Sequence, residues 1–269
     1  MFDAFGIHLG PLYIRFYALC LIGGMLAGLW LTARQAKAHG LDTEHIWNGF
    51  LWALIPGLIG ARLYHVLTPS PASGLTTQYY LENPLQILAI WNGGLGIYGA
   101  ILGGALGIVL YGLRHKQPIL RWLDVIVPGM ALGQAIGRWG NFINQELYGA
   151  PTDLPWAITI RPENRLPGYT EFERFHPLFL YESLWSLGAC LLLLYLDRRF
   201  GNRLRPGALL TLYVMSYAAI RFLLDFVRLD SHTLGGSLTT AQIVSLSALG
   251  VAGIILFFLQ RGGKGTQSA

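Results

Sequence analysis

Seven apolar segments, each about twenty residues long, constrain the fold of this 269-residue chain more than any other feature. An apolar helix of about 20 residues crosses the hydrocarbon core of a bilayer. Only 12% of the residues are charged, whereas a soluble domain has about 25%. We therefore predict an all-α, polytopic integral membrane protein with about seven transmembrane helices. The segments are 12–33, 46–67, 95–113, 122–143, 177–196, 207–228 and 239–260.

The basic residues are distributed unequally between the loops. Of 19 Lys and Arg residues, eleven follow the first, third, fifth and seventh segments, whereas residues 68–83 and 229–238 contain none. Because cytoplasmic loops are enriched in Lys and Arg, we predict that the N-terminus is outside and the C-terminus is cytoplasmic. The net charge of +5 belongs to these short loops, so it does not indicate nucleic-acid binding.

Two segments depart from the apolar pattern. Residues 144–176 contain charges of both signs and four prolines, so we predict a small extracytoplasmic cap between helices four and five; a disordered linker is the alternative. Residues 84–94 are apolar but interrupted by glycines, and we expect them to be interfacial or re-entrant. Otherwise residues 1–269 are expected to form a single integral membrane domain, without a cleavable signal.

The fourth segment contains a polar stripe. Gln134, Arg138, Asn141 and Gln145 recur at helical spacing and would share one helix face. Because an arginine at bilayer depth costs roughly 2.5–3.5 kcal/mol on insertion scales, we expect Arg138 to have a function. A fixed cation beside amide groups indicates a site for an anionic headgroup or substrate.

Further arginines lie at similar depth. At about 1.5 Å per residue, Arg62, Arg138 and Arg221 are each roughly 20–24 Å from the inner end of their helices, which places them in the outer half of the bilayer. Guanidinium groups suit bidentate phosphate binding. The residues therefore predict either an enzyme that uses phospholipid or a lipid transporter. The other arginines within or at the edges of segments are Arg15 and Arg228.

Some of these residues have a structural alternative. Arg15 and Arg228 could simply reach the outer headgroups. Arg221, Asp225 and Arg228 could form an ion-pair ladder along one helix. Tyr17 could be an ordinary aromatic residue of the membrane interface.

The same holds for other polar residues. Tyr98 is the second candidate for the membrane interface. His65 and His176 are expected to be structural, and Glu182 to be a buried partner of an arginine.

Glycines and cysteines are expected to serve packing. Clusters such as Gly103-Gly104-Gly107 are typical of close helix contacts; around Asn92–Gly99, approach of the backbone to a ligand is the alternative. Cys20 and Cys190 lie in apolar segments, without the spacing of a disulfide framework or metal site.

Residues 137–149, Gly-Arg-Trp-Gly-Asn-Phe-Ile-Asn-Gln-Glu-Leu-Tyr-Gly, resemble the signature of the prolipoprotein diacylglyceryl transferase family. The resemblance covers most of the chain and also implies seven helices with the N-terminus outside. Its other elements are Gly10-Pro11 followed by Tyr17, Gly60-x-Arg62, Trp91-x-Gly-Gly-x-x-x-Tyr98-Gly, His176-Pro-x-x-Leu-Tyr-Glu182, and Arg221-Phe-x-x-Asp225-Phe-x-Arg228.

The resemblance implies an enzyme of the bacterial cytoplasmic (inner) membrane. It would transfer the sn-1,2-diacylglyceryl group of phosphatidylglycerol, a membrane lipid, to the lipobox cysteine in the signal peptide of a prolipoprotein. A thioether forms and glycerol 1-phosphate leaves, chemistry that requires no metal or organic cofactor. The catalytic residues implied are Arg138, Arg221, Tyr98, Asn141, Glu146 and Tyr17. The residues implied to bind phosphatidylglycerol are Arg138, Arg221, Asn141, Gly149, Arg62, Asp225 and Arg228.

Two positions depart from the family pattern. Tyr98 stands where the family often has a histidine that is assigned as the catalytic base, and an unperturbed phenol titrates only near pH ~10. Either another group such as Glu146 is the base, or Tyr98 mainly positions the substrate. Asp225 stands where glutamate is common, which keeps the charge but shortens its reach.

Overall fold

The computed structural model describes residues 6–9, 12–69, 75–201, 203–229 and 238–261. Gly10-Pro11 and Lys264 therefore lie outside the described residues. The chain folds as two compact units, one from residues 1–35 and 123–269 and the other from residues 36–122. In the described part, seven helices are long and apolar enough to cross a membrane, which confirms the predicted fold class. The single membrane domain stays a prediction.

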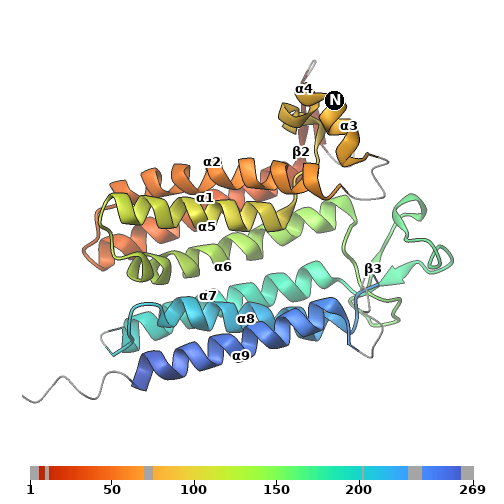
Figure 1. The fold of residues 1–269 in the computed structure, drawn as a ribbon. Helices are drawn as coiled ribbons and strands as arrows, with labels where there is room; N and C mark the ends of the chain where they lie inside the picture. Colours follow the sequence, from red (N-terminus) through yellow and green to blue (C-terminus); the bar gives the residue numbers. More distant parts are fainter. Residues whose placement is uncertain (1–5, 10–11, 70–74, 202, 230–237, 262–269) are drawn as a thin grey trace, which may run out of the picture. The chain divides into compact units, whose positions relative to one another are not determined.

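The first unit contains five of these helices. α7, α8 and α9 lie side by side in this unit (Figure 1). Its central core is formed by α1, α6, α7 and α8, with Val127 and Ala131 of α6 fully buried. The helices are α1 (Phe16–Ala38), α6 (Ile119–Asn144), α7 (Leu178–Phe200), α8 (Ala208–Asp225) and α9 (Thr240–Arg261).

The N-terminal residues differ from the prediction. Residues 12–15 are not the start of a helix but strand β2 (Leu12–Arg15), which pairs antiparallel with β1 (Gly6–Leu9). The aromatic and β-branched pair at positions 13 and 14 favours extended backbone. Helix α1 therefore begins at Phe16, and Arg15 lies on a strand rather than in the first helix.

Glycines bring α1 and α6 into close contact. A Cβ atom on Gly28 would lie 2.7 Å from the carbonyl oxygen of Gly129, and one on Gly24 would lie 2.6 Å from that of Gly133. Both distances are too short for a real side chain, so these positions require glycine. The interpretation that the glycines serve helix packing is confirmed here.

The second unit is a helix pair with a short connecting segment. Helices α2 and α5 pack against each other along their length (Figure 1). A Cβ atom on Gly103 of α5 would overlap the carbonyl oxygen of Pro56 of α2, so glycine again permits the contact. The elements are α2 (Glu44–Leu67), α3 (Thr77–Glu82), α4 (Pro84–Leu88), η2 (Ile90–Asn92) and α5 (Ile97–Arg114).

The segment between α6 and α7 is an ordered cap. Strands β3 (Ile158–Thr159) and β4 (Arg174–Phe175) pair antiparallel, and η3 (Pro162–Asn164) lies between them in the chain. Its small core consists of Tyr148, Ile160 and Phe175. The ordered cap is thus confirmed, and the alternative of a disordered linker is wrong. Its extracytoplasmic location stays a prediction.

Tyr148 connects the two halves of the cap. Its hydroxyl donates to the carbonyl oxygen of Asn164 at 2.9 Å and accepts from the backbone N–H of Leu166 at 2.6 Å. Burial raises the pKa of the Tyr148 phenol. The hydroxyl therefore stays protonated at neutral pH and keeps the hydrogen bond that it donates.

Candidate functional site

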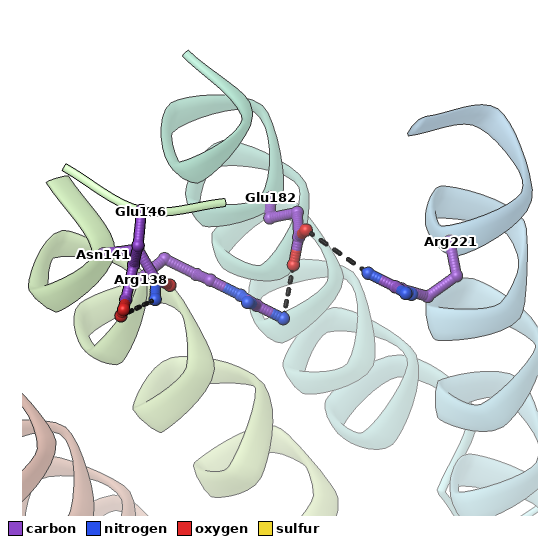
Figure 2. A network of polar contacts seen from close by, with 5 residues as sticks. All are labelled: Arg138, Asn141, Glu146, Glu182 and Arg221. Carbon is purple, nitrogen blue, oxygen red and sulfur yellow. Dashed lines mark hydrogen bonds and ion pairs between the residues drawn. The ribbon is translucent and has the colours of Figure 1, made fainter. Parts of the chain in front are cut away.

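A buried carboxylate near the start of α7 joins two arginines near the ends of α6 and α8 (Figure 2). Glu182 of α7 lies between Arg138 of α6 and Arg221 of α8. Its Oε2 forms an ion pair with Nη2 of Arg138, and its Oε1 lies 3.8 Å from Nη1 of Arg221. Each carboxylate oxygen thus faces a different guanidinium group. The sequence interpretation of Glu182 as a buried partner of an arginine is confirmed, and the partner is a pair.

Packing around the start of α7 holds Glu182 in this position. The hydroxyl of Ser183 donates to the carbonyl oxygen of Ala135 at 2.7 Å, which fixes α7 against α6 one residue from the carboxylate. On the other side, Leu178 of α7 packs with Ile220 and Leu224 of α8. Ile220 precedes Arg221, so the apolar contact sets the distance between the two charged side chains.

The turn that follows α6 places a second carboxylate, that of Glu146, beside the end of this helix. Gln145 has a positive φ of 52°, and the N–H of Glu146 bonds to the carbonyl oxygen of Asn141 at 3.0 Å. This is a Schellman turn with a residue other than glycine in the left-handed position. The turn folds the chain back, so Oε1 of Glu146 accepts a 2.9 Å hydrogen bond from Nδ2 of Asn141 (Figure 2).

The four residues of the predicted polar stripe form hydrogen bonds or ion pairs with four different parts of the chain. The Gln134 side chain bonds to Tyr213 of α8, Arg138 to Glu182, and Asn141 to Glu146. The prediction was wrong for Gln145, because the helix ends one residue earlier. Its side-chain oxygen instead accepts from the N–H of Arg161 at 2.9 Å and from Nδ2 of Asn164 at 3.2 Å, which fastens the cap.

Tyr17 lies beside this cluster. It is in the first turn of α1, and its ring lies against Gly140, where a Cβ atom would be 2.7 Å from Cδ2 of the ring. Glu146 and Arg138 both lie within electrostatic reach of its hydroxyl. The structure thus brings together five of the six predicted catalytic residues, although Arg221 joins them only through Glu182.

Gly149 has a packing role. A Cβ atom there would lie 2.9 Å from Cβ of His176 and 3.0 Å from the carbonyl oxygen of Val227. Its N–H donates to the carbonyl oxygen of His176 at 2.9 Å, and it forms an isolated β-bridge with Arg228. Glycine at 149 therefore lets the start of the cap pass between these segments. Its predicted role in binding phosphatidylglycerol stays a prediction.

Asp225 is tied to the start of α9. Its buried carboxylate accepts a hydrogen bond from Oγ1 of Thr239. Thr239 and Gln242 form a reciprocal capping box, with both hydrogen bonds at 3.1 Å. Asp225 therefore fixes the first turn of α9, and its predicted substrate-binding role, like that of Arg228, stays a prediction.

Arg62 and Tyr98 belong to the second unit. Arg62 is buried and donates to four backbone carbonyl oxygens, at distances from 2.5 to 2.9 Å. Four of the five N–H donors of a guanidinium group thus hold residues 86–94. Tyr98 is 64% exposed, with its ring 5.7 Å from that of Tyr64. The catalytic role of Tyr98 and the binding role of Arg62 stay predictions. The carbonyl oxygens bonded to Arg62 are those of Gln86, Ile87, Gly93 and Gly94.

Both histidines that we interpreted as structural are hydrogen-bonded to tyrosines. Nε2 of His65 lies 3.1 Å from the hydroxyl of Tyr80, and Nδ1 of His176 lies 3.1 Å from that of Tyr181. Tyr181 also accepts from Nε1 of Trp156 at 2.9 Å, which fixes the cap to α7. Among the described residues, no group of three or more His, Cys, Asp or Glu side chains could hold a metal ion.

The exposure of the cluster formed by Arg138, Glu182 and Arg221 determines what it can bind. The Arg138 and Arg221 side chains are 22% and 24% exposed, whereas that of Glu182 is only 6% exposed. An anion that approaches the cluster therefore meets guanidinium groups before it meets the carboxylate. Two cations on neighbouring helices, with donors in planar arrays, are suited to bind one phosphate group.

Glu182 belongs to the site, although the sequence predicts for it only the role of a buried acid that needs a basic partner. The signal was its place in the His176-Pro-x-x-Leu-Tyr-Glu182 motif, together with the cost of burying an unpaired carboxylate. What spacing alone could not give is that one carboxylate joins two different helices.

Known proteins are similar to this chain along most of its length. Residues 4–259 match the family model described as prolipoprotein diacylglyceryl transferase. A phosphatidylglycerol–prolipoprotein diacylglyceryl transferase of Synechococcus elongatus is 43% identical over 258 residues, which cover 94% of this chain and 86% of that protein. Proteins of the same name from Chloroflexus aggregans (40% identity; 97% of this chain and 88% of that protein) and Gloeobacter violaceus (41%; 95% and 92%) are also similar.

Proposed function

Because this chain belongs to the prolipoprotein diacylglyceryl transferase family, we propose that Arg138 and Arg221 bind the phosphate of phosphatidylglycerol during transfer. The protein is a multi-pass membrane transferase. The observation that carries the proposal is the pair of accessible guanidinium groups on two helices, held together by one buried carboxylate. Family membership favours this function over the lipid transporter.

The reaction explains why two arginines are needed. The thiolate of the lipobox cysteine attacks a glyceryl carbon, a C–S bond forms, and the C–O bond to the phosphate breaks. The electron pair of that bond goes to the phosphate oxygen, and glycerol 1-phosphate leaves. Negative charge therefore grows on the phosphate in the transition state. Charge-assisted hydrogen bonds from Arg138 and Arg221 stabilise that charge more strongly than they stabilise the substrate.

The proton of the thiol needs an acceptor, because the thiol is a weak nucleophile. We infer that Glu146 accepts it, with Asn141 and Tyr17 as positioning residues. The support is local: Glu146 bonds to Asn141, and both Glu146 and Arg138 lie within electrostatic reach of Tyr17. Tyr98 then has a positioning role towards the substrate.

We propose that this chemistry takes place at the outer leaflet of the bacterial cytoplasmic membrane. The support is the distribution of Lys and Arg, which favours an N-terminus outside and a C-terminus in the cytoplasm. In this orientation the cap and the arginine cluster are on the outer side. The substrates are phosphatidylglycerol and the signal peptide of a prolipoprotein, which carries the lipobox cysteine.

The test is a transfer assay with purified protein. We would incubate it with phosphatidylglycerol and a lipobox peptide, and measure the peptide mass and the released glycerol 1-phosphate. We expect one diacylglyceryl group on the cysteine, no product with a Cys-to-Ser peptide, and none with phosphatidylcholine as the only lipid. Movement of phosphatidylglycerol across liposomes without a peptide adduct would instead support the transporter.

A further inference from the structure

Glu182 reduces the positive charge that the arginine pair presents to a ligand. Without it, Arg138 and Arg221 would present two formal positive charges; with it, the three side chains sum to one (Figure 2). The carboxylate is nearly inaccessible, so it acts on a bound anion by repulsion rather than by contact. This property is separate from its effect on the position of the arginines.

The anion changes its charge during the reaction. The phosphodiester of the substrate carries one negative charge. The leaving phosphate monoester carries two above its second pKa of about 6. Repulsion by a fixed carboxylate is proportional to the charge of the ligand, so Glu182 opposes the binding of the product more strongly than that of the substrate.

We propose that Glu182 is a positioning residue that also sets the discrimination of the arginine pair between phosphodiester and phosphate monoester. It keeps the two guanidinium groups together for the transition state and weakens their hold on the dianionic product, so that the product leaves. This inference rests on the proposed function, because it assumes that the pair binds phosphate.

The helices that carry the cluster, the segments next to them and α1 contain other ionisable groups, and the experiment must separate their titration from that of the ligand. A diester does not titrate between pH 5 and 8, whereas a monoester gains a charge there. Titration of protein groups that changes both affinities by the same factor therefore leaves the ratio of the two affinities unchanged. The groups concerned are Tyr17 of α1, Glu146 after α6, His176 and Tyr181 at the start of α7, and Tyr213, Tyr217, Asp225 and Arg228 in or after α8.

The experiment measures the binding of glycerol 1-phosphate and of glycerophosphoglycerol, the deacylated diester headgroup. Full-length protein in phosphatidylcholine nanodiscs, without peptide, would be titrated with each ligand at pH 5 and pH 8. Between pH 5 and pH 8, the ratio of monoester affinity to diester affinity should rise in both proteins. We expect this rise to be about tenfold larger in Glu182→Gln than in the wild type. Glu182→Asp, which retains the charge, should behave as the wild type does.

Glu163→Gln is the matched control, because it removes one carboxylate from an exposed position in the cap of the same unit. Its affinity ratio should not differ from that of the wild type. In the transfer assay, Glu182→Gln should show a lower KM, a lower kcat and stronger inhibition by glycerol 1-phosphate. A purely structural role would raise KM or reduce the amount of folded protein.

An equal ratio in Glu182→Gln and the wild type at both pH values would overturn the proposal. If Glu182→Gln does not fold, the wild type decides: we expect it to bind the monoester at pH 8 less than tenfold more tightly than the diester. A stronger preference would overturn the proposal. Failure of the proposed function is distinguishable, since the wild type would then form no thioether.

Discussion

The polar stripe of α6 shows how the function of a residue depends on its partners. Gln134, Arg138 and Asn141 share a helix face, as their spacing predicts. Their partners are Tyr213, Glu182 and Glu146, which come from α8, α7 and the turn after α6. Only Arg138 of the three carries a charge that balances a buried acid, so it is the member that we assign to the phosphate.

Tyr98 is the residue whose role departs most from the family pattern. If it positions the substrate through its hydroxyl, Tyr98→Phe should lower the transfer rate by only about 2- to 10-fold, the effect of one neutral hydrogen bond. The pH profile should stay unchanged, and Tyr98→His should be active. Initial rates between pH 6 and 9 measure this.

Tyr64→Phe is a suitable control, because Tyr64 lies beside Tyr98 and its ring contacts that of Tyr98. A loss of 100-fold or more in Tyr98→Phe at neutral pH, with recovery as the pH rises towards the thiol pKa of about 8.5, would show that Tyr98 is the base after all.

At the scale of elements, hydrophobic length predicted the seven helices but not their ends. The apolar run of residues 12–33 begins with a strand, Leu12–Arg15, which pairs with Gly6–Leu9. Helical periodicity cannot reveal such a pairing partner, so the run was predicted to be a helix throughout. Gln145 continues the periodicity of α6, but its positive φ ends the helix. The residue at which a helix begins or ends depends on local turns and on distant pairing partners. The presence of a segment long enough to span the membrane can be read from its apolar composition alone.

The candidate site was predictable to a similar degree. The arginines of α6 and α8 could be assigned from sequence, because charge at bilayer depth is costly. Their connection through Glu182 could not, since the carboxylate is 44 residues from Arg138 and 39 from Arg221 in the chain. Arg62 had the same sequence signal as Arg138, yet its guanidinium group binds backbone carbonyls. Composition cannot distinguish these two uses.

The contact between α2 and α5 gives a test at the element scale. Gly103→Ala should destabilise the protein by about 1–3 kcal/mol, because its Cβ would overlap the carbonyl oxygen of Pro56. Gly104→Ala is the matched control on the same helix, since its Cβ would lie at an ordinary 3.5 Å from the carbonyl oxygen of Ala53. Thermal unfolding in detergent should show a lower Tm for the first variant only. Equal Tm values would mean that the two helices separate easily at this point.

At the scale of the whole molecule, the two units are connected through α1 and α6, each of which crosses a unit boundary near its cytoplasmic end as we predict it. The orientation that we predict in the membrane rests on the positive residues alone. It determines which leaflet supplies the lipid, so the proposed function depends on it.

Cysteine labelling tests this orientation. In a variant without Cys20 and Cys190, an impermeant thiol reagent added to intact cells should modify Glu163→Cys in the cap and leave Arg203→Cys unmodified. Both positions are exposed, and permeabilised cells, in which both should react, provide the control. Modification at 203 with none at 163 would place the cap in the cytoplasm and contradict the orientation.

The central claim is that Arg138 and Arg221 act together on one phosphate, and a double-mutant cycle of transfer rates tests it most directly. We would measure kcat/KM for the wild type, Arg138→Lys, Arg221→Lys and the double variant at matched protein levels. Lysine keeps the charge but loses the planar fork, so each single change should cost about 100- to 1,000-fold. The double variant should lose far less than the product of the two single losses, because both act on the same group. Near-wild-type rates in either single variant, or losses that multiply fully, would contradict the account.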